Sequence, residues 1–541
     1  MKRFRFWPWL AAVLSGGLLA LCFPCSRQWD ASWLCWVALA PLIAAIWFGG
    51  GTVLRAAQLG YVAGLVFFWG VFSWLRTVSD LGWFLLPFYL ALFPAAWAAF
   101  LCAARRGAGD FTRSGANLRL AALGAAAWVA MEWARGLGAL SFGWNGLGVA
   151  LHGNLAMIQI AEYTGVGGLS FLVALTNLIA VITVRRFWNE ARLRRIRPHW
   201  DFSANMALIG AVFAFGVRTL FAPVGGDAIP LRVTAVQANM PHNPEQIMDR
   251  AYASGVMERY GALTEVALAT RPQLLIWPES ATPGSLFASQ EVFDFVSGFA
   301  QRGDTNFLLG SLDFDEARHD YNIAALFTAR SPEPQTYRKM HLVPFGEYIP
   351  FRRSFPPFEW IIGNLVPGDF TPGTEYTVLK MERPSLNVGA LICFEDTLGD
   401  LTRHFVQRGA QLLVNVTNDG WFLRSQASEQ HLANAVFRTV ENRRPLVRAA
   451  NTGVTAFIDP FGRITNAFRP DGNPFHEGVL ADSIQVPPQT ASQTFYTRHG
   501  DVFALACAVA SLAALGVFLA RHRGQPQELS AHFENGRTRS I

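Results

Sequence analysis

The sequence predicts a protein in two parts, a multi-span α-helical membrane domain and an α/β domain. Long apolar runs recur up to residue 221 and return at 502–520, whereas residues 222–500 have the composition of an ordinary globular domain. Charged residues make up 16% of the chain and its mean hydropathy is +0.23, whereas a soluble protein carries roughly 25% charged residues. Within 222–500, short apolar strands alternate with helical stretches, which indicates a sheet covered by helices.

Eight apolar runs are candidates for helices that cross a bilayer, a task that takes about 20 mostly apolar residues. They cover 7–23, 33–48, 56–75, 83–104, 118–134, 167–184, 204–221 and 502–520. The first run follows basic residues, as in a signal peptide, but Trp7-Pro8-Trp9 suits an interface anchor and no small-residue cleavage site follows. We therefore expect residues 1–221 to hold seven spans and 501–523 to form the eighth.

The basic residues of the loops predict how these spans are oriented. The densest block lies in the sixth loop and holds Arg185, Arg186, Arg192, Arg194, Arg195 and Arg197, whereas the first, third and fifth loops carry only Arg27, Arg76 and Arg135. Basic side chains mark the cytoplasmic loops of membrane proteins. We expect both termini to be cytoplasmic, residues 222–500 to lie outside the membrane and a loose cytoplasmic tail at 524–541. The net charge of +6 forms no basic stripe in the globular region, so nucleic acid is not an expected partner.

The globular region divides into clear elements. Strands are expected at 231–238, 273–277, 306–312, 321–329, 386–392, 411–417, 446–450 and 454–458, and helices at 245–269, 289–301, 395–408 and 427–441. Reactive groups of α/β sheets gather where strands end. Three segments stand at such ends: Trp277-Pro278-Glu279, the run from Arg338 to Tyr348, and Ile392-Cys393-Phe394-Glu395.

The chemistry of these segments centres on Cys393, the only cysteine between residues 222 and 500. A thiol must lose its proton before it attacks a carbonyl group, because its free pKa is about 8.5. Glu279 can take that proton, and Lys339 can stabilise the anion that forms on the substrate oxygen. The three residues therefore form a consistent set for acyl transfer through a thioester. Singly, each has an ordinary structural interpretation: a core cysteine, a helix-capping neighbour and a solvated lysine.

The three segments resemble the Glu-Lys-Cys site of the nitrilase (carbon–nitrogen hydrolase) superfamily, and the eight-span frame resembles the apolipoprotein N-acyltransferase family. The resemblance covers almost the whole chain. Its further motifs are Lys339-x-His341-Leu342-Val343-Pro344-Phe345-Gly346-Glu347-Tyr348, Asn418-Asp419-Gly420-Trp421-Phe422, Arg438-x-x-Glu441-Asn442-Arg443-Arg444-Pro445, Ser141-Phe142-Gly143-Trp144-Asn145 and Gly165-Val166-Gly167-Gly168-Leu169-Ser170-Phe171.

The resemblance implies an αββα sandwich and a ping-pong reaction, in a bacterial inner membrane with residues 222–500 in the periplasm. Cys393 would take an acyl chain from a phospholipid, typically phosphatidylethanolamine, and pass it to the α-amine of a diacylglyceryl-modified N-terminal cysteine on an apolipoprotein. It makes Glu279 the general base, Lys339 the oxyanion stabiliser and Glu347 a supporting glutamate. Phe394 would offer its backbone N–H to the oxyanion and Glu395 would brace the site. For Glu347 and Glu395, an ordinary buried ion pair stays open as the alternative.

Candidates for substrate binding are Tyr348, Phe358, Trp360, Trp421 and Trp144. The apolar stretch 351–370 is interpreted as an arm that dips into the bilayer, with folding back into the core as the alternative. Trp421 and Phe422 line an acyl pocket or pack in the core. Family members often carry a Lys-Trp pair after the first strand, where this chain reads Gln237-Ala238-Asn239-Met240-Pro241-His242. An aromatic gate there is therefore in doubt, and His242 is interpreted as a polar loop residue.

Two rival functions differ in chemistry. A membrane-tethered amidase would pass the acyl group to water, but it needs one anchor at most. A transporter or a receptor with an inactive domain would not retain Glu279, Lys339 and Cys393 together. Neither a metal nor a nucleotide site is expected, because the histidines are scattered and Gly49-Gly50-Gly51 lacks a following Gly-Lys-Ser/Thr. A catalytic domain fixed to eight spans is expected to be a monomer.

Overall fold

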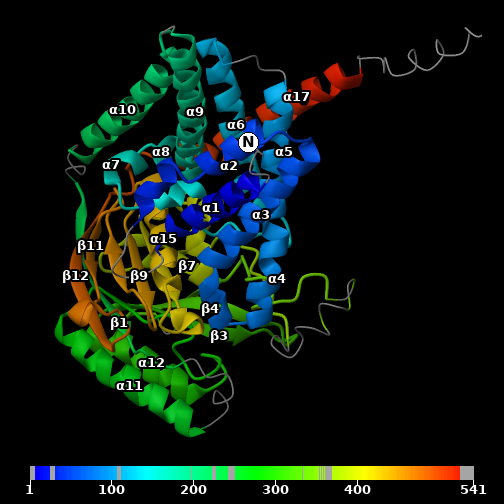
Figure 1. Cartoon of the computed structure of the whole chain (residues 1–541). Coiled ribbons are helices and arrows are strands. Elements are labelled where there is room, and N and C mark those ends of the chain that lie inside the picture. Colours follow the sequence, from blue (N-terminus) through cyan, green and yellow to red (C-terminus); the bar gives the residue numbers. More distant parts are fainter. Residues whose placement is uncertain are drawn as a thin grey trace, which may run out of the picture.

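The computed structural model describes residues 6–24, 31–106, 111–194, 197–221, 227–241, 250–331, 333–352, 354, 356, 359 and 368–523. His242 and two candidate substrate-binding residues, Phe358 and Trp360, lie outside the described residues, as does most of the 351–370 stretch. A bundle of helices from the N-terminal part stands on an α/β domain, and the C-terminal helix α17 (Val502–Arg523) returns to the bundle (Figure 1).

The bundle contains a helix in each predicted range. Its long helices are α1 (Trp7–Leu21), α3 (Val53–Val71), α4 (Asp80–Leu90), α5 (Leu92–Arg106), α6 (Ser114–Arg135), α9 (Val166–Leu193), α10 (Trp200–Leu220) and α17. Among the described residues, five segments are long and apolar enough to cross a membrane: Val53–Val71, Asp80–Arg106, Val166–Leu193, Trp200–Leu220 and Val502–Ala520. Helix α3 lies close to α5, where a Cβ on Gly60 would overlap the carbonyl oxygen of Pro94.

One predicted span takes an unexpected form. Range 33–48 folds as a short 3-10 helix, Ser32–Trp36, followed by α2 (Ala40–Phe48), which has nine residues. At 1.5 Å per residue α2 is about 14 Å long, about half the thickness of a hydrocarbon core. Alone it cannot cross a bilayer, so the number of eight spans stays a prediction.

The α/β domain consists of two six-stranded sheets packed face to face. The first has the order β12-β1-β2-β3-β4-β5 and the second β11-β10-β9-β8-β7-β6. Their strands are β1 (Ile229–Gln237), β2 (Leu274–Ile276), β3 (Asn306–Phe314), β4 (Asp320–Phe327), β5 (Gln335–Arg338), β6 (Val378–Met381), β7 (Leu386–Ile392), β8 (Leu412–Thr417), β9 (Leu446–Ala450), β10 (Ala456–Ile458), β11 (Ile464–Ala467) and β12 (Gly478–Val486). In each sheet the three strands β1–β3 or β7–β9 are parallel and the others antiparallel.

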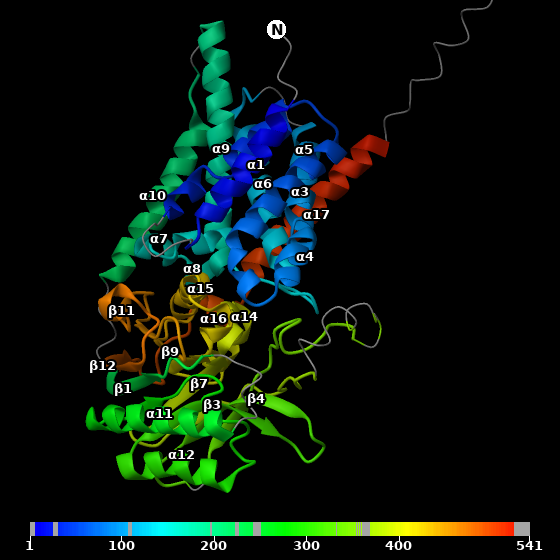
Figure 2. The same ribbon diagram turned by 60° about the horizontal axis from the view of Figure 1, so that its bottom comes forward.

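Helices cover the outer face of each sheet, which confirms the predicted αββα sandwich. Helices α11 (Arg250–Ala269) and α12 (Gln290–Gly303) cover the first sheet at the end remote from the bundle (Figures 1 and 2). Helices α14 (Gly399–Gln407), α15 (Ala427–Asn442) and α16 (Phe495–His499) lie between the second sheet and the bundle (Figure 2). Alternate residues of β1 separate the two cores: Val233 and Ala235 face the opposite sheet, while Val236 belongs to the cluster under α11 and α12.

Helix α15 is buried on all sides. Every residue of α15 except Glu429 is buried, although an outer helix of a sandwich ordinarily keeps one face in solvent. The bundle covers that face. The α/β domain and the bundle therefore share an extensive packed interface.

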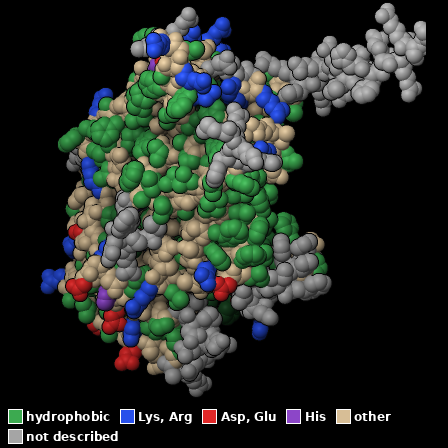
Figure 3. All heavy atoms as spheres, in the orientation of Figure 1, with side chains coloured by type: hydrophobic (Ala, Val, Ile, Leu, Met, Phe, Trp, Pro, Cys, Tyr) green, Lys and Arg blue, Asp and Glu red, His purple; other side chains and the backbone are tan. Residues whose placement is uncertain are grey.

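The surface of the bundle is apolar. Figure 3 shows hydrophobic side chains over its helices, with Lys and Arg gathered at the end remote from the sheets. Large exposed apolar side chains include Leu14 on α1, Phe213 on α10 and Leu512 on α17. Such a band is typical of a protein surface in contact with lipid.

Candidate active site

The three predicted catalytic residues follow three different strands. Glu279 comes after β2, Lys339 directly after β5 and Cys393 directly after β7. The structure brings them together: Lys339 Nζ lies 3.8 Å from Glu279 Oε1, and the thiol of Cys393 interacts electrostatically with both side chains. Residues from both sheets thus meet at one place.

The Glu279 carboxylate is held by two donors. Its Oε1 accepts a hydrogen bond from Asn322 Nδ2 at 2.8 Å, and its Oε2 accepts one from the backbone N–H of Asn418 at 2.9 Å. Strand β3 passes directly beneath, where a Cβ on Gly310 would lie 2.5 Å from Glu279 Cα. Burial raises the pKa of the Glu279 carboxyl, and the Lys339 cation opposes that effect only in part. The carboxyl is fixed in place and is more basic than an exposed glutamate.

Lys339 is a buried cation between two carboxylates. Its Nζ donates to Glu347 Oε1 at 2.8 Å, and Glu347 is fixed in turn by Asn322 Nδ2 at 3.1 Å and the backbone N–H of Val343 at 2.8 Å. Burial acts to lower the pKa of the Lys339 ammonium, but Glu347 and Glu279 outweigh it, so the pKa is raised. The ammonium keeps its charge and can face a developing oxyanion.

Cys393 occupies a sharp turn at the end of β7, where it is the first residue of a 3-10 helix, Cys393–Thr397. Its φ is +51°, a left-handed conformation that non-glycine residues adopt only where the surrounding structure stabilises it. Burial and the Glu279 anion raise the pKa of the thiol, while Lys339 and the Thr417 hydroxyl act to lower it. The resting thiol is therefore protonated and needs a base.

Glu395 joins the lysine segment to the cysteine turn. Its Oε1 accepts hydrogen bonds from Tyr337 OH at 2.8 Å and from the backbone N–H groups of Met340 and His341 at 2.9 and 3.0 Å. Its Oε2 accepts from the backbone N–H of Ile392 at 2.9 Å. Burial raises the pKa of Glu395 to about 6. In geometry Glu395 braces two loops, whereas Glu347 forms an ion pair with Lys339.

The helix bundle forms one wall of the site. The ring of Phe394 stacks on Trp144 at 5.8 Å between centroids and an interplanar angle of 20°, and on Phe142 at 6.1 Å and 25°. His341 stacks on the same ring at 5.9 Å. The residue after the candidate nucleophile therefore lies in an aromatic cluster built from both parts of the chain.

The described candidate substrate-binding residues lie at the same junction. Trp144 is buried in the aromatic wall. Tyr348 OH donates to the carbonyl oxygen of Ala139 in the bundle at 3.0 Å, and Thr77 Oγ1 donates to that of Trp421 at 3.4 Å. Trp421 keeps 43% of its surface exposed, so of the three it is the one most open to a ligand.

Sequence reasoning missed two polar residues at the site. Asn322 holds both Glu279 and Glu347, and Thr417 contacts the thiol. Both are buried polar side chains in otherwise apolar strands, β4 and β8. A polar residue that interrupts a buried strand needs a partner, which is the signal that could have identified them.

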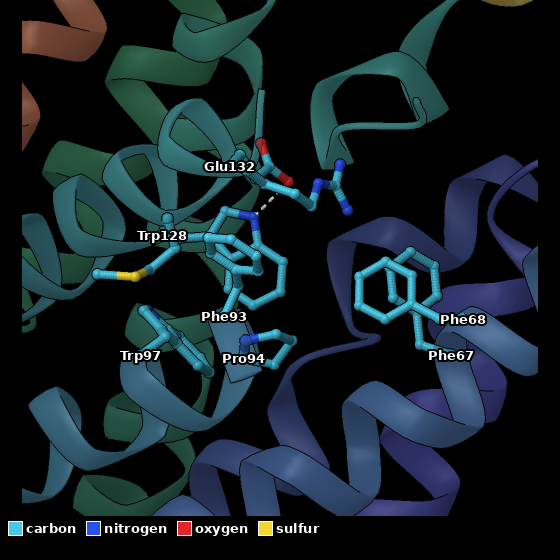
Figure 4. Close-up of a pocket in the computed structure, with 9 residues that line it drawn as sticks. Phe67, Phe68, Phe93, Pro94, Trp97, Trp128 and Glu132 are labelled. Atoms are coloured by element: carbon cyan, nitrogen blue, oxygen red, sulfur yellow. Dashed lines mark hydrogen bonds between the residues drawn. The ribbon is translucent and has the colours of Figure 1, made fainter. Parts of the chain in front are cut away.

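A pocket lies within the bundle between α3, α5 and α6 (Figure 4). It is lined by Phe67, Phe68, Phe93, Pro94, Trp97, Trp128, Met131, Glu132 and Arg135. Trp128 Nε1 donates to Glu132 Oε1 at 2.7 Å, and Arg135 Nη2 donates to the carbonyl oxygen of Trp144 at 3.1 Å. Aromatic contacts run on from Phe68 through Phe72 and Phe142 to Phe394. The pocket and the site thus share a continuous aromatic wall.

Comparison with known families matches both parts of the chain. The carbon–nitrogen hydrolase model matches residues 232–487, and the model of the apolipoprotein N-acyltransferase N-terminal domain matches residues 15–179. Among solved structures, a CN-hydrolase superfamily protein from Xanthomonas campestris covers 53% of this chain and 97% of its own, at 18% identity and a TM-score of 0.37. The family model over residues 232–487, together with two sheets covered by helices, identifies the α/β domain as a carbon–nitrogen hydrolase domain with the αββα fold.

Relatives extend the match to the full length. The apolipoprotein N-acyltransferase of Geobacter metallireducens is 36% identical over 95% of this chain and 96% of its own. That of Nitrosomonas europaea is 30% identical over 90% of this chain and 94% of its own. The chain belongs to the apolipoprotein N-acyltransferase family.

Proposed function

We propose that this protein transfers an acyl chain from a phospholipid, through a thioester on Cys393, to the N-terminal amine of a diacylglyceryl-cysteine apolipoprotein and so completes lipoprotein maturation. The single observation that carries the proposal is the way the α/β domain and the helix bundle meet at the candidate active site. A carboxylate, a buried ammonium and a thiol converge beside an aromatic wall that continues into an apolar pocket of the bundle. A hydrolase of small soluble amides needs no such wall.

In the first half-reaction Glu279 takes the proton of the Cys393 thiol. The thiolate attacks the ester carbonyl of the donor lipid, and the resulting oxyanion is stabilised by the Lys339 ammonium and the Phe394 backbone N–H. When the tetrahedral intermediate collapses, the ester C–O bond breaks. The departing alkoxide takes the proton from Glu279 and leaves as a lysophospholipid.

In the second half-reaction the acceptor amine attacks the thioester carbonyl. Glu279 takes a proton from the amine, the same two groups stabilise the oxyanion, and the C–S bond breaks. The Cys393 thiolate regains its proton from Glu279, so the enzyme returns to its starting state with an amide on the acceptor. Glu279 acts as base and then as acid in both halves.

The aromatic wall that the pocket of Figure 4 shares with the site offers an apolar surface along which we expect an acyl chain of the donor to lie. Phosphatidylethanolamine is the expected donor. We propose that the catalytic domain lies in the periplasm and that both termini are cytoplasmic. The Lys and Arg side chains at the remote end of the bundle (Figure 3) support this orientation, because such residues are retained on the cytoplasmic side. The protein is expected to act as a monomer.

Intact mass measured after incubation with phosphatidylethanolamine vesicles tests the proposal. The wild type is expected to gain one acyl chain, lose it to hydroxylamine, and pass it to a diacylglyceryl lipopeptide. Cys393→Ala is expected to gain none, whereas Cys507→Ala, in α17, is expected to behave like the wild type. Ready hydrolysis of small amides with no transfer to lipopeptide would contradict the acyltransferase and favour the amidase.

A further inference from the structure

A fully buried cluster of charged side chains lies behind the Cys393 turn. Its members come from four elements: Asp396 from the turn itself, Asp419 from a 3-10 helix (Asp419–Phe422), His431 from α15 and Arg448 from β9. All four side chains have an exposed fraction of 0%. The proposed chemistry leaves all four untouched. Burying charged groups costs free energy unless they are paired. A cluster of four such groups outside the proposed chemistry therefore indicates a structural or functional role.

The four side chains form a closed network. Arg448 Nη1 donates to Asp396 Oδ2 and Nη2 donates to Asp419 Oδ2, both at 2.7 Å. His431 Nδ1 lies 3.0 Å from Asp419 Oδ1, and its Nε2 lies 2.7 Å from Asp396 Oδ1. Arg448 and His431 each contact both carboxylates, and Arg448 Nη2 lies 2.9 Å from His431 Nδ1. No member can rotate without breaking contacts to two others.

This network holds the carbonyl oxygen of Cys393. That oxygen accepts hydrogen bonds from His431 Nε2 at 3.3 Å and from Asn415 Nδ2 at 2.9 Å. Arg448 Nη1 also lies 3.4 Å from Asn415 Oδ1, which orients the amide so that its NH₂ faces the carbonyl. Two donors, both fixed by the network, therefore converge on a single backbone oxygen.

The consequence follows from the geometry of the peptide group. In a planar trans peptide the C=O and the next N–H point in opposite directions. Holding the Cys393 oxygen toward the network thus directs the Phe394 N–H away from it, to the side on which substrate must lie. The positive φ of Cys393 is a conformation that persists only where the surroundings over-determine it.

We propose that His431 and Asn415, held by Arg448, Asp396 and Asp419, are positioning residues that fix the Cys393–Phe394 peptide with its N–H preorganised as an oxyanion donor. The inference rests on the proposed function, in which that N–H stabilises both tetrahedral intermediates. The network acts only where an oxyanion forms.

Two reactions of Cys393 separate this role from general support of the fold. Alkylation by iodoacetamide displaces iodide at a saturated carbon and forms no oxyanion. Acylation by a p-nitrophenyl ester or by phospholipid passes through a tetrahedral oxyanion. Loss of one oxyanion donor costs roughly 100- to 1,000-fold in rate, so its misplacement is expected to cost about 10- to 100-fold.

The test compares Asn415→Leu and His431→Gln with Asn434→Leu in the full-length protein in detergent. Asn434 is a buried amide of α15 that donates to Asn145 Oδ1 and the Gln430 carbonyl oxygen and is not bonded to Cys393. Asn415→Leu is expected to lower acylation about 10- to 100-fold while alkylation changes less than about threefold. His431→Gln, which retains a side-chain donor, is expected to lose less. Asn434→Leu is expected to leave the ratio of the two rates unchanged.

A parallel fall of both rates in Asn415→Leu, or no change in either, overturns the inference. Thermal unfolding shows whether each variant is folded. If Asn415→Leu does not fold, the same comparison of rates is made with His431→Gln. The activated ester keeps the inference separate from the proposed function. If wild type reacts with the ester but gains no chain from phospholipid, the proposed function fails while the ratio of acylation to alkylation still decides the role of the network.

Discussion

Glu279 is the proposed general base, so its protonation is expected to control activation of the Cys393 thiol. Burial raises its pKa above the ordinary value of 4.5, so it keeps a proton at pH values at which an exposed glutamate has lost it. A general base works only when deprotonated. The rate of acyl-enzyme formation is therefore expected to rise with pH through a midpoint above 4.5, measured with the p-nitrophenyl ester across the acid range. Glu279→Gln should remove this dependence and lower the rate at least about 100-fold. A midpoint at or below the ordinary value would contradict this role.

The charge of Lys339 is tied to its two carboxylate neighbours. Lys339→Met leaves Glu279 and Glu347 buried without the cation between them, and breaking a buried pair in this way costs about 3–5 kcal/mol. The melting temperature of Lys339→Met is therefore expected to lie below that of the wild type. The double variant Lys339→Met/Glu347→Gln removes one carboxylate and is expected to recover most of the stability. It should stay inactive, because no cation then faces the oxyanion. Equal melting temperatures for the two variants would show that the ion pair does not stabilise the fold.

At the scale of elements, the placement of Glu279 depends on how closely β3 approaches the end of β2. A Cβ on Gly310 would lie 2.5 Å from Glu279 Cα and 2.8 Å from the carbonyl oxygen of Pro278, both backbone atoms. Gly310→Ala is therefore expected to displace Glu279 and to lower acylation by the ester at least tenfold, on the order of what a 1 Å misplacement costs. Gly298→Ala, in α12 with no neighbouring atom within 4 Å, is the control. It is expected to retain full activity and to gain up to about 1 kcal/mol of stability.

The strands of the α/β domain were predictable from the sequence where burial requires an apolar run. All eight predicted strands are present, because a strand buried on both faces gives an uninterrupted apolar run. Strands β5, β6, β11 and β12 were missed. β5 is Gln335–Arg338 and β11 is Ile464–Ala467, each only four residues long, and β12 alternates irregularly because much of it is exposed. Edge strands of this kind are defined by pairing with a neighbour, which the local sequence does not record.

At the scale of the whole molecule, Gln430 connects the two parts of the chain. Its Oε1 accepts from Trp74 Nε1 at 3.1 Å, Trp144 Nε1 at 3.3 Å and Asn145 Nδ2 at 2.9 Å. Its Nε2 donates to the carbonyl oxygens of Pro24 and Val71 at 3.0 and 3.1 Å. One buried side chain of α15 thus satisfies five groups of the helix bundle.

Gln430→Leu is expected to loosen this junction. Each buried group left without a partner costs about 1–3 kcal/mol, so the variant should lose roughly 3 kcal/mol or more of stability. Transfer from phospholipid should fall more than acylation by the soluble ester, because Trp144 also supports the wall of the site. The measurements are thermal unfolding, the rate of transfer from phospholipid and the rate of acylation by the soluble ester. Gln290→Leu, an exposed change on the remote helix α12, is the control; equal effects of the two changes would refute a role for Gln430 at the junction.

The sequence by itself predicted the two-part architecture and the three candidate catalytic residues. Apolar runs and strand ends are local, and the chemistry of Glu279, Lys339 and Cys393 follows from their side chains. Only the tertiary structure decided which groups fix them. Glu279 meets the Asn418 backbone across 139 residues of chain, and Tyr348 meets Ala139 across 209. The same holds for the network behind Cys393, whose members come from four elements. Contacts of this kind arise when two sheets and a helix bundle pack together, and they depend on three-dimensional distance, which neither composition nor periodicity encodes.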